Sequence, residues 1–192
     1  MCKNSIDFQR GNAHPDLVLL GACPGQNEWR AIPQRPFAGQ SGVNLLSLLE
    51  VFRNQPDEVL CGLQPDDFIS TNLDDYTLMN SHPEAKWPAE HGRSTPRMSE
   101  IGTQENQLRL TNQLRSVGAR FVVGLGRPIN DTHLVLRRKD SGPLRAIRLL
   151  APHHPEISFY VTGHPSPRAV NRFGNGNSRQ WFEETLWKFP KQ

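Results

Sequence analysis

The 192-residue chain has little cysteine and no cluster of metal-binding residue types. Its three cysteines, Cys2, Cys23 and Cys61, form no C-x-x-C pair, which argues against a disulfide framework and against zinc or iron–sulfur spacing. The seven histidines are scattered, with one adjacent pair at His153-His154. We therefore predict that the protein holds no metal and needs no cofactor.

The sequence also lacks an apolar run long enough to cross a bilayer and a signal-peptide pattern, which predicts a cytoplasmic protein. Its length fits a single domain over residues 1–192, which we expect to be monomeric. The net charge of +3 permits an anionic partner, and basic residues gather at 137–139. A solvated surface explains such charges equally well, so charge alone does not identify nucleic acid as the partner.

Short apolar runs alternate with helical patterns along the chain. The runs predict strands, and the apolar periodicity predicts helices over 41–53, 99–117 and 178–188. The four predicted strands cover 16–21, 68–71, 121–125 and 157–162. This alternation predicts an α/β protein, a three-layer α/β/α fold around a central four-stranded, mainly parallel sheet. Ligands bind at the carboxyl ends of such strands, which are marked here by Gly21, Asn72, Gly126 and His164.

The loop after the first predicted strand carries the most distinctive pattern, GACPGQNEWRAIPQRPFAGQSG at 21–42. It lacks the Lys-Ser/Thr ending of a P-loop and the G-x-G-x-x-G of a dinucleotide fold. It has instead two proline corners, and Phe37 stands on the second. Taken by itself, this loop suggests a tight turn and a core phenylalanine.

Four segments, in order, resemble the uracil-DNA glycosylase superfamily over most of the chain. The segments GACPG at 21–25 and RPFAGQSG at 35–42 resemble the first motif of the family-4 enzymes. Thr71-Asn72 is similar to the strand-end asparagine that reads the base, and ARFVVGLG at 119–126 is similar to the third strand. HPSP at 164–167 resembles the second catalytic motif of the family-1 and single-strand-selective enzymes.

The resemblance implies a monofunctional DNA glycosylase that hydrolyses the N-glycosidic bond of uracil or another damaged base flipped out of DNA, in base excision repair. Phe37 would stack on the base, and the Asn72 amide would match its donor and acceptor edge. His164 would donate to the negative charge that develops on the departing base. The implied base-binding residues are Gly21, Ala22, Gly25, Phe37 and Asn72.

The implied partner is DNA, double- or single-stranded. Arg168 stands where family members carry a side chain that wedges into the duplex, and the single-strand-selective enzymes resemble this chain in having arginine there. The residues expected to contact DNA are Ser41, Ser166, Pro167, Arg168 and Arg172. Because Gly25 replaces a bulky residue of the uracil-only enzymes, thymine-like and other modified pyrimidines, or hypoxanthine, stay open as substrates.

Two departures from the family pattern affect the prediction. The cysteines of the family-4 iron–sulfur cluster are missing, and Ala22 and Cys23 replace the first-motif residue that positions the attacking water. Cys23 and Glu28 are the candidates for that catalytic role, and Asp74 and Asp75 are further ones. A catalytically impaired glycosylase-like DNA-binding module is therefore the alternative to an active enzyme.

Overall fold

The computed structural model describes residues 4–54, 65–126 and 141–189. Cys2, Cys61 and the basic residues at 137–139 lie outside these ranges. No helix among the described residues is long and apolar enough to cross a membrane.

The chain folds around one six-stranded sheet with the order β1-β3-β2-β4-β5-β6. In that order the strands cover Phe8–Gln9 (β1), Tyr76–Asn80 (β3), His14–Gly21 (β2), Phe121–Leu125 (β4), Ser158–Thr162 (β5) and Trp187–Lys188 (β6). The four inner strands are parallel, and the two edge strands are antiparallel to their neighbours. The predicted α/β class is confirmed. The predicted count of four strands omits the edges, which are only two residues long and therefore leave no periodic signal.

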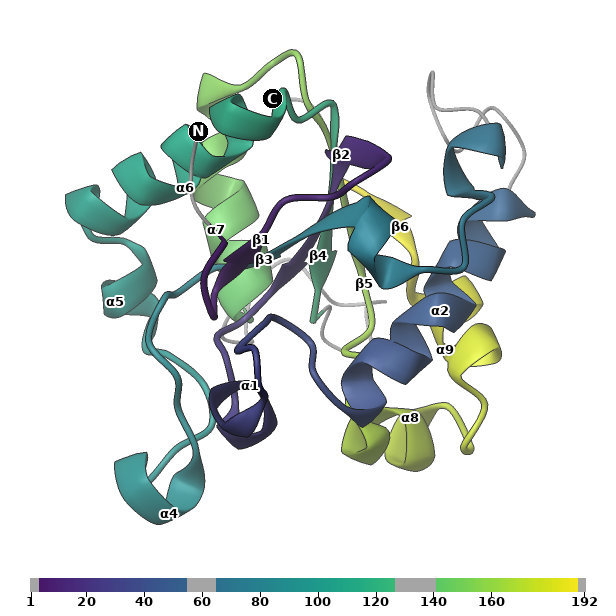
Figure 1. Cartoon of the computed structure of the whole chain (residues 1–192), viewed down its shortest axis with the longest axis horizontal. Coiled ribbons are helices and arrows are strands. Elements are labelled where there is room, and N and C mark those ends of the chain that lie inside the picture. Colours follow the sequence, from purple (N-terminus) through teal and green to yellow (C-terminus); the bar gives the residue numbers. More distant parts are fainter. Residues whose placement is uncertain (1–3, 55–64, 127–140, 190–192) are drawn as a thin grey trace.

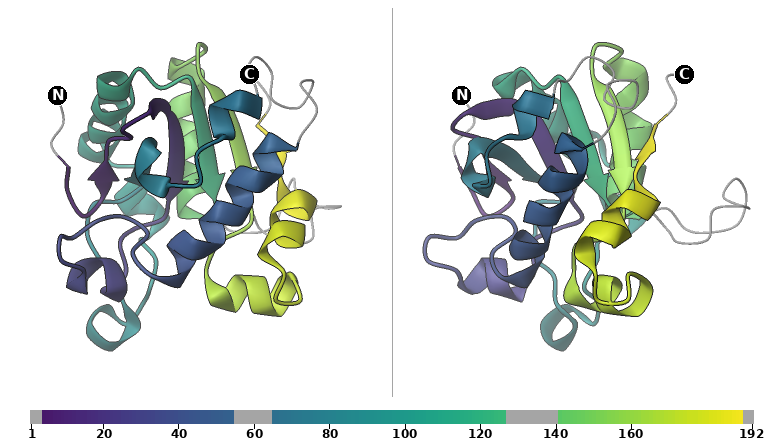
Figure 2. Two further views of the ribbon diagram at one scale, coloured as in Figure 1. Left: turned by 45° about the vertical axis from the view of Figure 1, so that its right-hand side comes forward. Right: turned by 90° about the vertical axis from the view of Figure 1, so that its right-hand side faces the viewer.

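Helices cover both faces of the sheet, as the side views show (Figure 2). One layer contains α2 (Gln40–Arg53), α8 (Pro167–Phe173) and α9 (Ser178–Thr185). The other contains α5 (Met98–Ile101), α6 (Gln104–Val117) and α7 (Gly142–Leu150). Alternate residues of β2 pack against the two helical layers. Leu17 and Leu19 belong to the core on the α2 side, and Val18 and Leu20 belong to the core on the α6 side. The short helices α1 (Gln26–Arg30) and α4 (Pro88–His91) lie at the carboxyl edge of the sheet (Figure 1).

The helix predicted over 99–117 is divided in two. Thr103 starts α6, because its hydroxyl accepts a hydrogen bond from the Asn106 backbone N–H at 3.2 Å. Gly118 ends α6 in the left-handed conformation, with φ at 61°. The helix α7 between β4 and β5 was not predicted.

The strand predicted at 68–71 is wrong. Phe68 ends a 3-10 turn (Pro65–Phe68) and stacks on Phe52 with ring centroids 4.9 Å apart, while Ile69 is 61% exposed. The strand lies instead at Tyr76–Asn80, where every residue is buried and pairs with β2 in parallel. Because Gly21 is in register with Asn80, the asparagine at the carboxyl end of this strand is Asn80 and not Asn72.

Candidate active site at the carboxyl edge of the sheet

Gly21, the last residue of β2, is where two candidate side chains meet. A Cβ atom on this residue would lie 2.5 Å from Oδ1 of Asn80 and 2.7 Å from Cζ of Phe37. Both side chains are almost fully buried. Glycine therefore leaves the space in which the Phe37 ring and the Asn80 amide lie against the end of the strand.

The loop that carries Phe37 is held in an unusual backbone conformation. Phe37 has φ of 54°, and a Cβ on Gly42 would lie 2.3 Å from the Phe37 carbonyl oxygen. An ion pair of 2.8 Å joins Arg35 to Asp74, whose carboxylate also accepts from Nε2 of Gln9 at 2.9 Å. A bulky residue at positive φ is costly, so these tertiary contacts maintain the position of the ring.

Asn72 does not occupy the predicted position. It is exposed at the amino end of β3, where its Oδ1 accepts from the Asp74 backbone N–H at 3.1 Å and starts the 3-10 turn Leu73–Asp75. Asp74 and Asp75 lie in the same turn, where Asp75 accepts a hydrogen bond from the Ser70 hydroxyl. These residues stabilise the turn before β3, and the predictions that they read the base or position water relied on a strand that is absent.

His164 follows β5 at the same edge of the sheet, as predicted. Its Nδ1 accepts a hydrogen bond from the Ser166 backbone N–H at 3.0 Å, and burial lowers the pKa of the imidazole. The ring is therefore neutral near pH 7 and carries its proton on Nε2, which can donate. The indole of Trp181 fixes the backbone by donating to the His164 carbonyl at 3.0 Å.

Hydrogen bonds hold the Phe37 loop and the His164 loop together at the carboxyl edge of the sheet. Gly126, after β4, donates its N–H to the Thr162 carbonyl at 2.8 Å, which aligns the ends of β4 and β5. Asn44 of α2, the helix after the Phe37 loop, donates from Nδ2 to the Pro165 carbonyl at 2.7 Å. The loops of Phe37 and His164 are therefore parts of one assembly at the carboxyl edge.

In the first-motif turn, burial raises the pKa of both Glu28 and Cys23. Oε2 of Glu28 accepts from the Gly25 backbone N–H at 3.0 Å, and burial raises the pKa of this carboxyl. The Cys23 thiol lies 3.6 Å from the Ser94 carbonyl oxygen, and burial raises its pKa to about 12. A thiol that stays protonated cannot accept a proton from water, so the structure argues against the predicted catalytic role of Cys23.

The predicted DNA-binding residues lie around the same edge. Pro167 and Arg168 are exposed in the first turn of α8, and Arg172 is exposed in the last. Ser41 is half-buried in the first turn of α2. The Ser166 hydroxyl accepts from the Ala169 backbone N–H at 3.3 Å, so it starts α8.

Sequence reasoning missed Asn80 and Asn44. The signal for Asn80 is the run Tyr76–Met79 directly before it, which follows closely after the segment 68–71 that the sequence analysis predicts as a strand. Asn44 lies on a helix face and shows no distinguishing pattern, since its partner Pro165 is 121 residues away.

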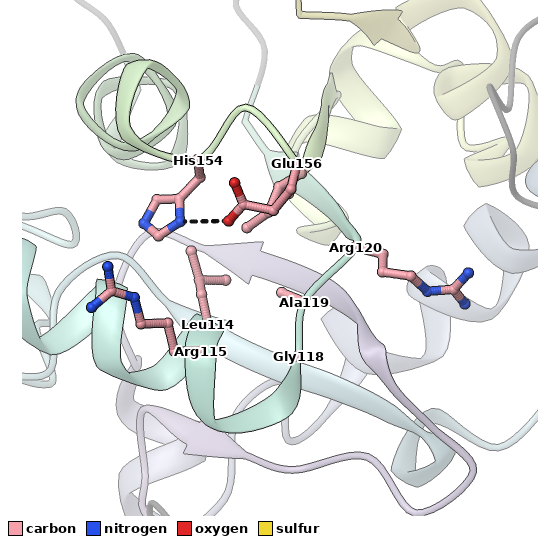
Figure 3. A pocket seen from close by; sticks show the side chains of 8 residues that line it. Leu114, Arg115, Gly118, Ala119, Arg120, His154 and Glu156 are labelled. Carbon is pink, nitrogen blue, oxygen red and sulfur yellow. Dashed lines mark hydrogen bonds and ion pairs between the residues drawn. The ribbon is translucent and has the colours of Figure 1, made fainter.

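A separate hollow of about 350 Å³ lies at the opposite edge of the sheet (Figure 3). In it the imidazole of His154 and the carboxylate of Glu156 face each other at 3.1 Å, while Arg120 points away. Because β4 and β5 begin at Phe121 and Ser158, the hollow lies at the amino ends of the strands, where open α/β sheets do not place their ligands.

Comparison with protein-family models gives a match over almost the whole described chain. The model of the uracil DNA glycosylase superfamily matches residues 8–189, from β1 to just beyond β6. None of the curated proteins matches the chain. Among the described residues, no group of three or more His, Cys, Asp or Glu side chains can hold a metal ion.

Proposed function

Because the chain belongs to the uracil DNA glycosylase superfamily, we propose that it is a monofunctional DNA glycosylase. It hydrolyses the N-glycosidic bond of uracil, or of another damaged or modified base, after that base has left the DNA stack. The observation that carries this proposal is the joint placement of Phe37 and Asn80 against Gly21.

Asn80 takes the base-reading role that the sequence prediction gave to Asn72. Its amide offers one acceptor and two donor hydrogens, which match O4 and N3–H of uracil. Phe37 supplies an aromatic face for the extruded base. Because both side chains are buried and held by the fold, they are ordered before the base arrives.

His164 stabilises the leaving group. As the glycosidic bond breaks, negative charge accumulates on the base, largely at O2. The Nε2–H of the neutral imidazole donates a hydrogen bond to this oxygen, and the ring needs no additional proton to do so. Such a donor acts mainly on the transition state, where the charge exists.

Glu28 positions the attacking water. Its Oε2 accepts a hydrogen bond from the Gly25 backbone N–H, which holds the carboxyl group at the first-motif turn. A carboxyl group with a raised pKa is better matched to accepting a proton near neutral pH. A Cβ on Gly25 would lie 3.0 Å from Oε2 of Glu28, so the absence of a side chain at this position leaves the carboxylate undisturbed.

The experiment is base release from single- and double-stranded oligonucleotides carrying uracil, hypoxanthine or a 5-modified pyrimidine, detected by alkaline cleavage. We expect release from at least one substrate, and loss of release in Asn80→Ala. Asn54→Ala is the matched control, because it removes an exposed amide just after the last residue of α2, where Nδ2 donates to the Glu50 carbonyl. A wild-type protein that binds DNA but releases no base would favour the alternative, a catalytically impaired DNA-binding module, which the Ala22-Cys23 pair suggests.

A further inference from the structure

Two tryptophans beside the candidate site leave aromatic surface open to solvent. Trp29 on α1 is 52% exposed, which is unusual for so large an apolar side chain. Its ring centroid lies 6.2 Å from that of Trp87, with the planes tilted by 40°. The ring of His91 packs edge-on against Trp87 at 4.8 Å. The rings form a short aromatic row that ends in the exposed Trp29.

The backbone at or next to each tryptophan is hydrogen-bonded to the first-motif turn. The Trp29 backbone N–H donates to the Gly25 carbonyl at 3.1 Å. Lys86, which precedes Trp87, donates its N–H to the Pro24 carbonyl at 2.9 Å. The aromatic row therefore lies beside the first-motif turn, and α1 and α4 both lie at the carboxyl edge of the sheet (Figure 1).

Local contacts fix the row before any partner binds. The Trp87 N–H donates to Nδ1 of His91 at 3.3 Å, and Nε2 of Gln34 donates to the Trp29 carbonyl at 2.8 Å. The exposed Arg30 follows Trp29 directly and supplies positive charge beside it. Aromatic faces next to a cation are the combination that binds unpaired nucleotides, because bases stack on the rings while the cation contacts phosphate.

We propose that Trp29 and Trp87 form a stacking shelf for unpaired bases that flank the excised one. The shelf rests on the proposed function, because it assigns the neighbouring surface to the same DNA. Bases within a duplex already stack on their neighbours and present no free face. The preferred substrate is accordingly single-stranded or locally opened DNA.

The test measures binding without catalysis, by fluorescence anisotropy of a labelled oligonucleotide carrying a tetrahydrofuran abasic analogue, as a single strand and as a duplex. Trp29→Ala is expected to weaken single-strand binding about tenfold, equivalent to about 1.4 kcal/mol, and to change duplex binding much less. Trp87→Ala should act in the same direction. Trp29→Phe should retain most of the affinity, because it keeps an aromatic face.

Leu108→Ala is the matched control, since Leu108 is similarly exposed, at 59%, on α6 and away from the row. Equal losses for single strand and duplex, or no loss for either, would overturn the shelf. Self-association of the wild type in sedimentation velocity, abolished by Trp29→Ala, would also overturn it and make the row a protein interface. The base-release assay tests the proposed function separately. If the enzyme releases a base but Trp29→Ala does not weaken single-strand binding, the proposed function stands and the stacking shelf is refuted.

Discussion

Gly21→Ala is the sharpest perturbation of the candidate site, because one methyl group would meet both side chains that we propose bind the base. The added Cβ would lie 2.5 Å from Oδ1 of Asn80 and 2.7 Å from Cζ of Phe37, whereas ordinary van der Waals contact at a Cβ begins near 3.4 Å. The differences, 3.4 − 2.5 = 0.9 Å and 3.4 − 2.7 = 0.7 Å, are the displacements needed to relieve the two contacts. The amide and the ring would therefore have to move by most of an ångström.

A displacement of this size affects rate and stability to different extents. Misplacing a positioning group by about 1 Å can cost roughly a hundredfold in rate, so we expect kcat/KM of the variant to fall by about that factor. Overpacking of a tight site costs typically about 1–3 kcal/mol. For a domain of this size each kcal/mol lowers Tm by roughly 2–4 °C, so the variant should still be folded at 25 °C.

Single-turnover base release, combined with thermal unfolding, separates the two effects. Gly118→Ala is the control: no atom lies within 4 Å of its Cβ position, but its φ of 61° makes alanine strained there. That strain costs about 1–2 kcal/mol, and Gly118 lies at the opposite edge of the sheet. The control should lose stability and keep its rate. A Gly21→Ala variant with the wild-type rate and only a lowered Tm would refute the proposed base-binding roles of Phe37 and Asn80.

Four further predictions test the remaining groups. His164→Ala should lower the single-turnover rate by roughly two to three orders of magnitude, with little effect on binding to undamaged DNA. Because burial lowers the pKa of His164, the wild-type rate should stay level as the pH falls through 6.5. The free energy of unfolding should decrease below pH 6.5, because there the unfolded state takes up a proton that the folded state does not. Glu28→Gln keeps an acceptor for the Gly25 N–H and should slow base release by about a hundredfold. Cys23→Ser should keep the wild-type rate. A larger loss of rate in Cys23→Ser than in Glu28→Gln would contradict the assignment of Glu28 as the group that positions water. Arg168→Ala should weaken DNA binding for all sequences and reduce the salt dependence of log K by about one, and an unchanged slope would remove Arg168 from the phosphate contacts. Metal analysis of the purified protein should find no stoichiometric iron, and a stoichiometric amount would show that the isolated cysteines do bind a cluster.

The sequence alone determined the elements whose signals are local. The apolar runs of β2, β4 and β5 and the periodicity of α2 predicted the parallel sheet and the edge at which a site belongs. Gly21, Phe37 and His164 were predicted at that edge because each follows directly from a strand end or a motif next to one. These predictions needed no knowledge of distant contacts.

Only the tertiary structure decided which asparagine, Asn72 or Asn80, lies at the carboxyl end of a strand beside Gly21. The run at 68–71 and the run at 76–79 are both prone to form strands, and nothing local separates them. Pairing with β2 selects the second run and brings Asn80 beside Gly21. The first run ends a turn instead, because the ring of Phe68 packs against Phe52 and Tyr76.

The chemical state of the site was likewise set by the fold. Burial and the Ser166 N–H keep His164 neutral with its proton on Nε2, and burial keeps the Cys23 thiol protonated. Residue types and their spacing identify which groups are present. Their protonation depends on desolvation and on partners brought in from elsewhere in the fold, and these exist only once the chain has packed.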